Sequence, residues 1–423
     1  MAARETPFLL NSLTVIFCTG AVIVVLYFGN VQRYDDWLYD HDCRFWYSAG
    51  KAWLQGESPY NFSVFSRMWI SEFNGDPRTK NHAFVYPPAI LIIGIPLSLL
   101  PWDTARVVFR LLSVFSFFGS CILMLLIMSY ASKDMLRKRS TWMYCAMCCL
   151  LFSVMQTMFQ GQTPLLVMFG IMLLVYGWQR GLVAACILGC LFASLKPQMS
   201  FFFILYVFFA GGHKKVLAGA AVVVIITALL LVSSSTHTLF QHMLHSLTIH
   251  RQQGFNDLNQ YDCVTGLFGA AAGGPALFYG GIFVGVAVVI LLARGTAFRP
   301  TAKPGLPVQI RHLQLIAALT VGLMPLHRYD AVAYVLVVGT LGFIHGTFSR
   351  LVLLCAVLVH GAVWRLTGYY ARIVLGFTDD QIFNPLEFHY WLTTSHLASL
   401  FSGIVLFLII LYFFRDRKHY TTP

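Results

Sequence analysis

The sequence predicts an all-α polytopic membrane protein. Of its 423 residues, 58% are hydrophobic and only 11% are charged, and the mean hydropathy is +0.70. Soluble domains carry about a quarter charged residues, so this composition lies far outside their range. Repeated apolar runs of about 18 residues or more are long enough to cross a bilayer as helices. No segment has the composition of a soluble domain, and we expect one integral membrane domain over residues 1–423.

Short basic segments between the apolar runs predict the topology. The net charge is +12, but the basic residues gather in loops such as 133–139 and 211–215 rather than on one face. Such loops mark the inner side of a membrane, and this pattern argues against nucleic-acid binding. The first apolar run, within 1–30, fits an uncleaved signal anchor. We expect about 11–13 crossings and a long first outer loop, roughly 30–88, that carries interfacial helices.

The apolar runs after residue 140 give the expected spans. They are 141–160, 164–179, 216–233, 276–293, 312–326, 331–349, 351–370 and 396–414. A further run, 182–210, contains SLKPQ at 194–198. Because proline removes a backbone donor and lysine is costly at mid-bilayer, we expect two short segments broken there. This break puts Gln162 and Lys196 on the same outer side. The short run from Ala89 to Leu100 is either re-entrant or a crossing that violates the charge rule.

The stretch FWYSAGKAWL, residues 45–54, predicts an amphipathic helix in the first outer loop. The residues on its broad apolar face are Phe45, Trp46, Ala49, Trp53 and Leu54. Aromatic side chains in this arrangement suit the headgroup layer, so we expect the helix to lie flat on the outer leaflet. It would hold the turn at 40–42 over the mouth of the bundle. A plain anchoring helix is the simpler alternative.

Ionisable residues gather on the predicted outer side. They are Asp35, Asp36, Asp40, His41, Asp42, Arg44, Lys51, Lys196, His250, Arg251, Asp257, Asp262, His327, Arg328 and Asp330. Charged residues beside membrane helices are costly and tend to mark function. Solvation in a loop is the better interpretation for Asp35, Asp36 and Asp257, and a local ion pair explains Arg328 with Asp330 equally well.

This set of groups suits the transfer of a group from a lipid-linked phosphate. A carboxylate can deprotonate an acceptor hydroxyl as a general base, and cations can neutralise the phosphate that leaves. The sequence has no G-x-x-x-x-G-K-[ST] phosphate cradle, so we expect chemistry on the outer face without ATP.

Residues 40–61, DHDCRFWYSAGKAWLQGESPYN, resemble the first-loop signature of glycosyltransferase family 87, which has D-x-x-x-[YW]-Y-x-A followed by a glycine and a [PL]-Y pair. Further segments match family motifs in order: the Tyr-Pro-Pro segment at 84–101, the Gly-Gln motif at 160–168, the Lys-Pro-Gln motif at 193–198, an outer-loop stretch at 262–274 and a tyrosine-aspartate turn at 325–336. The resemblance covers about 40–336. Residues 337–423 are variable and are expected to carry acceptor specificity.

The resemblance implies a C-type glycosyltransferase fold and an inverting transfer of a sugar, with mannose the best-known cargo of the family. The donor would be a polyprenyl-phosphate sugar and the acceptor a lipid or glycan. Asp42 would be the general base by motif register, with Asp40 as its rival, and Lys196 and Arg328 would bind the donor phosphate. The other residues expected to contact substrates are His41, Tyr86, Gln162, His327, Tyr329 and Asp330.

The remaining expectations concern cofactors, location and rival functions. No cofactor or metal ion is implied, although the Asp40–His41–Asp42 turn could ligate a cation. We expect an integral protein of a bacterial inner membrane, among membrane lipids, with its site facing the periplasm or exterior. The main alternative is a transporter or lipid flippase, against which stand the long first loop and the lack of an internal repeat. A structural scaffold would leave Lys196 unexplained.

Overall fold

The computed structural model describes residues 40–73, 83–131, 139–148, 151–232, 236–252, 274–297, 306–324, 326, 328–344, 346–369 and 396–417. Helices dominate these residues and no strand occurs among them, so the predicted all-α class is confirmed for this part of the chain. The N-terminal apolar run, most of the basic loop at 133–139 and the outer segments 253–273 and 371–395 lie outside the described residues.

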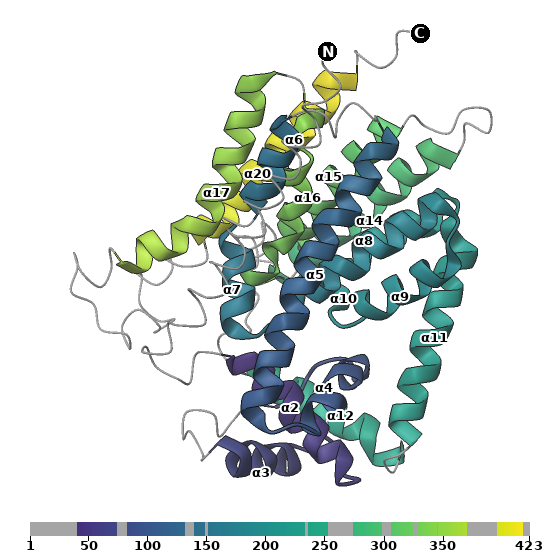
Figure 1. Ribbon diagram of the computed structural model, residues 1–423, viewed down its shortest axis with the longest axis vertical. Helices are drawn as coiled ribbons and strands as arrows, with labels where there is room; N and C mark the ends of the chain where they lie inside the picture. The colour runs from purple at the N-terminus through teal and green to yellow at the C-terminus, as the bar shows by residue number, and fades with distance from the viewer. Residues whose placement is uncertain are drawn as a thin grey trace, which may run out of the picture.

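Helix α5 (Trp102–Ala131) runs along much of the length of the molecule (Figure 1). At its lower end in Figure 1 lie α2 (His41–Leu54), α3 (Phe62–Phe73), α4 (Leu91–Ser98) and α12 (Thr236–Gln252). Toward the other end lie α6 (Arg139–Met147), α17 (Thr347–Tyr369) and α20 (His396–Arg417). The described part of the predicted first outer loop thus lies, together with α4 and α12, at one end of the described structure.

The middle of the molecule consists of the helices between these ends. They are α7 (Phe152–Gln160), α8 (Pro164–Arg180), α9 (Val183–Ala193), α10 (Pro197–Val207), α14 (Gly274–Ala297), α15 (Leu306–Leu323) and α16 (Tyr334–Gly339). Helices α8 and α9 are in close contact because glycines face the neighbouring backbone. A Cβ at Gly170 would lie 2.7 Å from the Ala193 nitrogen, and one at Gly189 would lie 2.5 Å from the Leu174 nitrogen.

Two helical stretches in the described part are long and apolar enough to cross a membrane. Within Trp102–Ser129 an 18-residue stretch has a mean hydropathy of 2.5, and within Pro197–Leu230 such a stretch has 1.8. The second stretch bends at Gly211, whose φ of 97° interrupts the helix between α10 and α11 (His213–Val232). This bend falls at the start of the basic segment 211–215 that the sequence predicts as a loop. Large apolar side chains are exposed on α5 and α11. These features indicate that the protein is associated with a membrane.

Several predicted runs correspond to single helices, and others are divided. The run at 182–210 is broken between Ala193 and Pro197, as its proline and lysine predict. The run at 141–160 is two helices, α6 and α7, and the run at 331–349 is a series of short helical segments. In the last run α16 ends at Gly339, where a Cβ would lie 2.2 Å from the Met124 Cε atom, so close packing on α5 occurs where the helix stops.

The short apolar run from Ala89 to Leu100 forms a short helix. Its helix α4 has 8 residues, which corresponds to a length of about 12 Å. The hydrocarbon core of a bilayer is about 30 Å thick. A helix of this length suits a re-entrant segment, and that interpretation of the run remains a prediction.

Helix α2 includes the predicted 45–54 but begins earlier, at His41, so Asp42 lies in its first turn. Protein rather than lipid covers most of its aromatic face. Phe45 is 7% exposed, and Trp46 and Ala49 are fully buried. The Trp46 ring packs edge-on against Tyr86 with centroids 4.4 Å apart, and Phe45 contacts Trp69 of α3 at 4.8 Å. The prediction that this face lies flat on the outer leaflet is therefore wrong. An apolar face looks the same in sequence whether lipid or another helix covers it.

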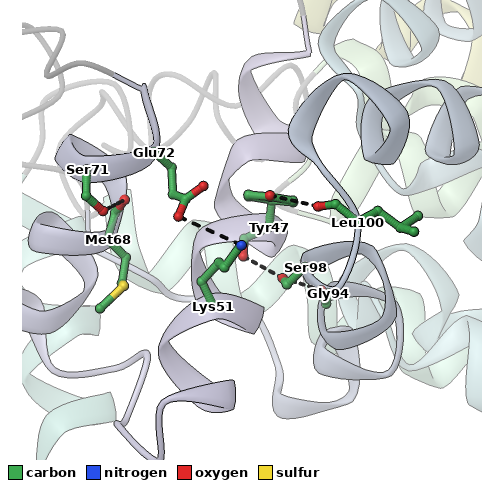
Figure 2. A network of polar contacts seen from close by, with 8 residues as sticks. All are labelled: Tyr47, Lys51, Met68, Ser71, Glu72, Gly94, Ser98 and Leu100. Atoms are coloured by element: carbon green, nitrogen blue, oxygen red, sulfur yellow. Dashed lines mark hydrogen bonds and ion pairs between the residues drawn. The ribbon is translucent and has the colours of Figure 1, made fainter.

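Hydrogen bonds fix α2 against its neighbours (Figure 2). The Tyr47 hydroxyl donates to the Leu100 carbonyl oxygen at 2.9 Å, and the Ser98 hydroxyl donates to the Tyr47 carbonyl oxygen at 2.7 Å. Lys51 and Glu72 form a long ion pair of 3.9 Å between α2 and α3. These bonds hold the first-loop helices together as one unit.

The contact of α2 with α4 at Gly50 leaves no room for a side chain. A Cβ there would lie 2.1 Å from the Ser98 Oγ and 2.3 Å from the Gly94 carbonyl oxygen. Since the Gly94 backbone cannot yield without moving α4, Gly50→Ala should lower the free energy of unfolding by about 1–3 kcal/mol. Thermal unfolding in detergent measures this loss. The control is Gly280→Ala on α14, where no atom lies within 4 Å of an added Cβ. Equal stability of the two variants would contradict this packing.

Candidate active site

Asp42 lies in the first turn of α2 and faces the turn between α7 and α8. Its Oδ2 atom accepts a hydrogen bond from the Gln162 side-chain amide. The side chain is half-buried. Burial raises the pKa of Asp42 to about 7, the Gln162 bond and the charge of Lys196 oppose the rise, and the charge of Asp330 adds to it. Near neutral pH, therefore, this carboxyl group can both release and accept a proton.

Gly161 permits the approach of α2 to the turn that carries Gln162. Helix α7 ends at Gln160, and Gly161 follows with a φ of 65° in the left-handed region. A Cβ at Gly161 would lie 2.8 Å from the Cys43 Cβ atom and 3.2 Å from the Asp40 Cα atom. Glycine meets both requirements because it has no Cβ. The Gly-Gln pair therefore places an amide directly beside Asp42.

Tyr86 reaches the same group of side chains from the segment before α4. The Tyr60 hydroxyl donates to the Tyr86 carbonyl oxygen at 2.6 Å and so holds this segment near α2. Burial, followed by the charges of Asp42 and Asp330, raises the pKa of the Tyr86 hydroxyl well above its ordinary value. The hydroxyl therefore stays protonated and lies within the field of both acids.

Lys196 lies at the break between α9 and α10. It precedes Pro197, the first residue of α10, with an extended φ of −145°. Its Nζ donates to Asp330 Oδ1 at 2.6 Å, and the two residues are 5% and 0% exposed. Asp330 comes from η8 (Arg328–Ala333), a segment that contacts both α7 and α8. The buried ammonium therefore has a carboxylate partner beside the Asp42 group.

The structure thus brings together Asp42, Tyr86, Gln162, Lys196 and Asp330, which the sequence nominates from separate motifs.

The other predicted site residues have different outcomes. The backbones of Arg328 and Tyr329 belong to η8 next to Asp330, but their side chains lie outside the described part. His327 also lies outside the described residues, as do Asp35, Asp36, Asp257 and Asp262. The His41 ring packs edge-on against Phe45 and Trp69, each at 5.5 Å between centroids. His41 therefore belongs to the aromatic contact between α2 and α3.

Asp40, the rival to Asp42, is in a different environment. It is 1% exposed, and both its carboxylate oxygens accept bonds from Arg110, with Nε to Oδ1 at 3.1 Å. Arg110 is not among the residues that the sequence predicts for the site. A signal existed, because Arg106 and Arg110 have i,i+4 spacing near the start of an apolar helix, where charges are costly.

Among the described residues, no three His, Cys, Asp or Glu side chains are grouped as metal ligands. The expectation that no metal or other cofactor takes part remains a prediction.

The arrangement has the groups that acid–base group transfer requires. A half-buried carboxylate with a pKa near 7 can act as a general base, and a nearby ammonium can stabilise an anion. The model of glycosyltransferase family 87 matches residues 84–324, more than half of the chain. The chain belongs to glycosyltransferase family 87. Neither a curated protein nor a solved structure is significantly similar to it.

Membership in glycosyltransferase family 87 confirms the resemblance and makes the protein a glycosyltransferase. The matched range includes Tyr86, Gln162 and Lys196, whereas Asp42 precedes it and Asp330 follows it. The fold brings these two acids beside residues of the matched range.

The Lys196–Asp330 pair predicts a characteristic pattern of stability. Lys196→Met would leave Asp330 buried without its ammonium partner, which costs about 3–5 kcal/mol. Adding Asp330→Asn removes the buried charge and should recover most of that loss. Thermal unfolding of the purified proteins compares the variants.

The matched control is Lys51→Met, because the Lys51–Glu72 pair is 28% exposed on each side and 3.9 Å long. An exposed pair of this kind contributes about 0–1 kcal/mol. A double variant at 196 and 330 that is less stable than Lys196→Met alone would overturn the assignment of a buried ion pair.

Proposed function

We propose that this glycosyltransferase moves a sugar from a polyprenyl-phosphate donor to a hydroxyl group of a lipid or glycan acceptor. The observation that supports it best is the placement of the Asp42 carboxyl, with a pKa of about 7, near the buried Lys196 ammonium. Mannose is the proposed sugar, because it is the best-known cargo in the family that the first-loop motif resembles.

Asp42 is the proposed general base. It takes the proton of the acceptor hydroxyl while the hydroxyl oxygen bonds to the anomeric carbon. The bond from that carbon to the phosphate oxygen breaks at the same time, and polyprenyl phosphate leaves with the bonding electrons. One base with no covalent intermediate gives inversion at the anomeric carbon. The half-buried position of Asp42 favours it over Asp40, whose carboxylate is occupied by Arg110.

Cations stabilise the phosphate that leaves. Lys196 is held in place by Asp330 at 2.6 Å, and Arg328 lies two residues before Asp330 in η8. Their positive charges would meet the negative charge that develops on the departing oxygen. Gln162 orients Asp42 through its amide. Tyr86, Gln162, Asp330, His41, His327 and Tyr329 remain the proposed substrate contacts.

The reaction is proposed to occur at the outer face of a membrane. The supporting observations are the two long apolar helices and the bond from Arg110, near the start of α5, to Asp40 at the start of α2. The finer proposals are a C-type glycosyltransferase fold with about 11–13 crossings, a single domain over 1–423, and a bacterial plasma membrane with the site toward the periplasm or exterior. The last helices, within 337–423, are proposed to select the acceptor.

Loss of the base tests the reaction. Purified protein in nanodiscs should transfer radiolabelled mannose from polyprenyl-phosphate mannose, and Asp42→Asn should lower kcat by about 10²- to 10⁴-fold. The control is Asp103→Asn on α5, since that side chain is 81% exposed and pairs only with neighbouring Arg106 in the described structure. Full activity of Asp42→Asn would eliminate it as the base. No turnover by wild type with any polyprenyl-phosphate sugar would overturn the donor class.

The rate should also depend on pH through Asp42. The groups that face its carboxyl are Gln162, Lys196, Asp330 and the hydroxyl of Tyr86, which lies in the segment before α4. Only the ionised carboxylate can accept a proton, so kcat/KM should fall about tenfold per pH unit below about 7 and level off above it. Initial rates between about pH 5 and 9, with stability checked at each pH, measure this. A profile that is flat across neutrality would contradict the role of Asp42.

A further inference from the structure

The start of α2 is joined to two other parts of the protein at Asp40. The Asp40 carboxylate accepts both bonds from Arg110 of α5. Its backbone N–H donates to the Phe159 carbonyl oxygen of α7 at 3.1 Å. One residue therefore links the helix that carries Asp42 to α5 and to the helix that leads to Gln162.

Asp40 has an unusual backbone conformation. Its φ of 56° makes it the one non-glycine residue with positive φ among the residues that the structure describes. Such a conformation is uncommon for side chains other than glycine and persists where the surroundings over-determine it. The Arg110 fork, the Phe159 bond and the near-complete burial of Asp40 supply that support.

The contact is close enough to set the position of Asp42. Gly161 touches both Asp40 and Cys43, with distances from an added Cβ of 3.2 and 2.8 Å. Gln162 follows Gly161 and reaches Asp42, which lies between Asp40 and Cys43 in the chain. A shift of the Asp40 backbone would therefore move Asp42 relative to the Gln162 amide.

We propose that Asp40 and Arg110 form a positioning pair that holds the start of α2 in register with the Gly161–Gln162 turn. The pair acts on catalysis through the Asp42 carboxylate and does not touch substrate. This inference rests on the proposed role of Asp42 as the base. The contact between the start of α2 and the Gly161–Gln162 turn, however, can also be measured without an activity assay.

Arg110→Gln should lower kcat by about 10- to 100-fold, since small displacements of a catalytic group cost about that much. KM for the donor should stay within about twofold, because no substrate contact is removed. The matched control is Arg106→Gln, one turn earlier on α5, which forms an ion pair with the exposed Asp103. That variant should keep the wild-type kcat.

A double-substitution cycle tests whether Asp40 and Arg110 act as a unit. Asp40→Asn with Arg110→Gln should lower kcat no more than the worse single variant, because each alone already breaks the pair. Arg110→Lys keeps the charge but lacks the planar fork of guanidinium donors. It should fold like wild type and recover only part of the lost kcat, which keeps the test decisive if Arg110→Gln folds poorly.

The reactivity of the Cys43 thiol reports how closely the start of α2 packs against Gly161. Its thiol is free and fully buried, and its Cβ lies against Gly161. Arg110→Gln should increase labelling of Cys43 by N-ethylmaleimide at least about tenfold over wild type, read by mass spectrometry of the Cys43 peptide, whereas Arg106→Gln should not.

The outcomes separate the two hypotheses. An active Asp42→Asn enzyme would overturn the role of the base, whatever Cys43 shows. An inactive Asp42→Asn enzyme, together with an Arg110→Gln or Arg110→Lys enzyme that matches Arg106→Gln in kcat and in Cys43 labelling, would overturn the positioning pair alone. Additive losses in the double-substitution cycle would also overturn it.

Discussion

The contact of α2 with the turn at Gly161 is the constraint on which the rest of the site depends. Gly161 has no Cβ and has left-handed backbone dihedral angles, so the start of α2 can approach this turn to van der Waals distance. The next residue, Gln162, then meets Asp42, which is 120 positions away in the chain. The buried pair of Lys196 and Asp330, 134 positions apart, lies close enough to this contact to influence the charge of Asp42. Helices from distant parts of the chain are thus assembled around Gly161, a residue without a side chain.

Much of the site could be predicted because its signals are local. A proline and a lysine within an apolar run predict a break, and the structure has that break between α9 and α10. The predicted break puts Gln162 and Lys196 on the same side of the membrane, and both lie near Asp42 in the fold. Register within the first-loop motif favours Asp42 over Asp40 as the base, which remains a prediction, and the structure gives the two carboxyl groups different surroundings.

The rest could not be predicted because it depends on which surfaces meet. Helical periodicity identifies the apolar face of α2 but not its partner, so a face covered by α3 and α4 was assigned to lipid. Arg110 has the same limitation: it pairs with Asp40 across 70 positions, and within its own apolar helix nothing indicates an acid opposite. In the sequence, the short elements of 331–349 look like one apolar run. Helix α16 ends at Gly339, which packs closely on α5, and the sequence around Gly339 does not show this contact with a distant helix.

Three helices begin at this site: α2 at His41, α8 at Pro164 and α10 at Pro197. The start of a helix exposes backbone N–H groups and carries about half a positive charge. The main chain therefore contributes a positive potential beside Asp42 that belongs to the fold itself. Side-chain substitution can remove the ammonium of Lys196, but it leaves these peptide dipoles in place. The positive potential at the site consequently has two sources. One is a few charged side chains, which substitution can remove, and the other is the helix dipoles, which change only if the helices move.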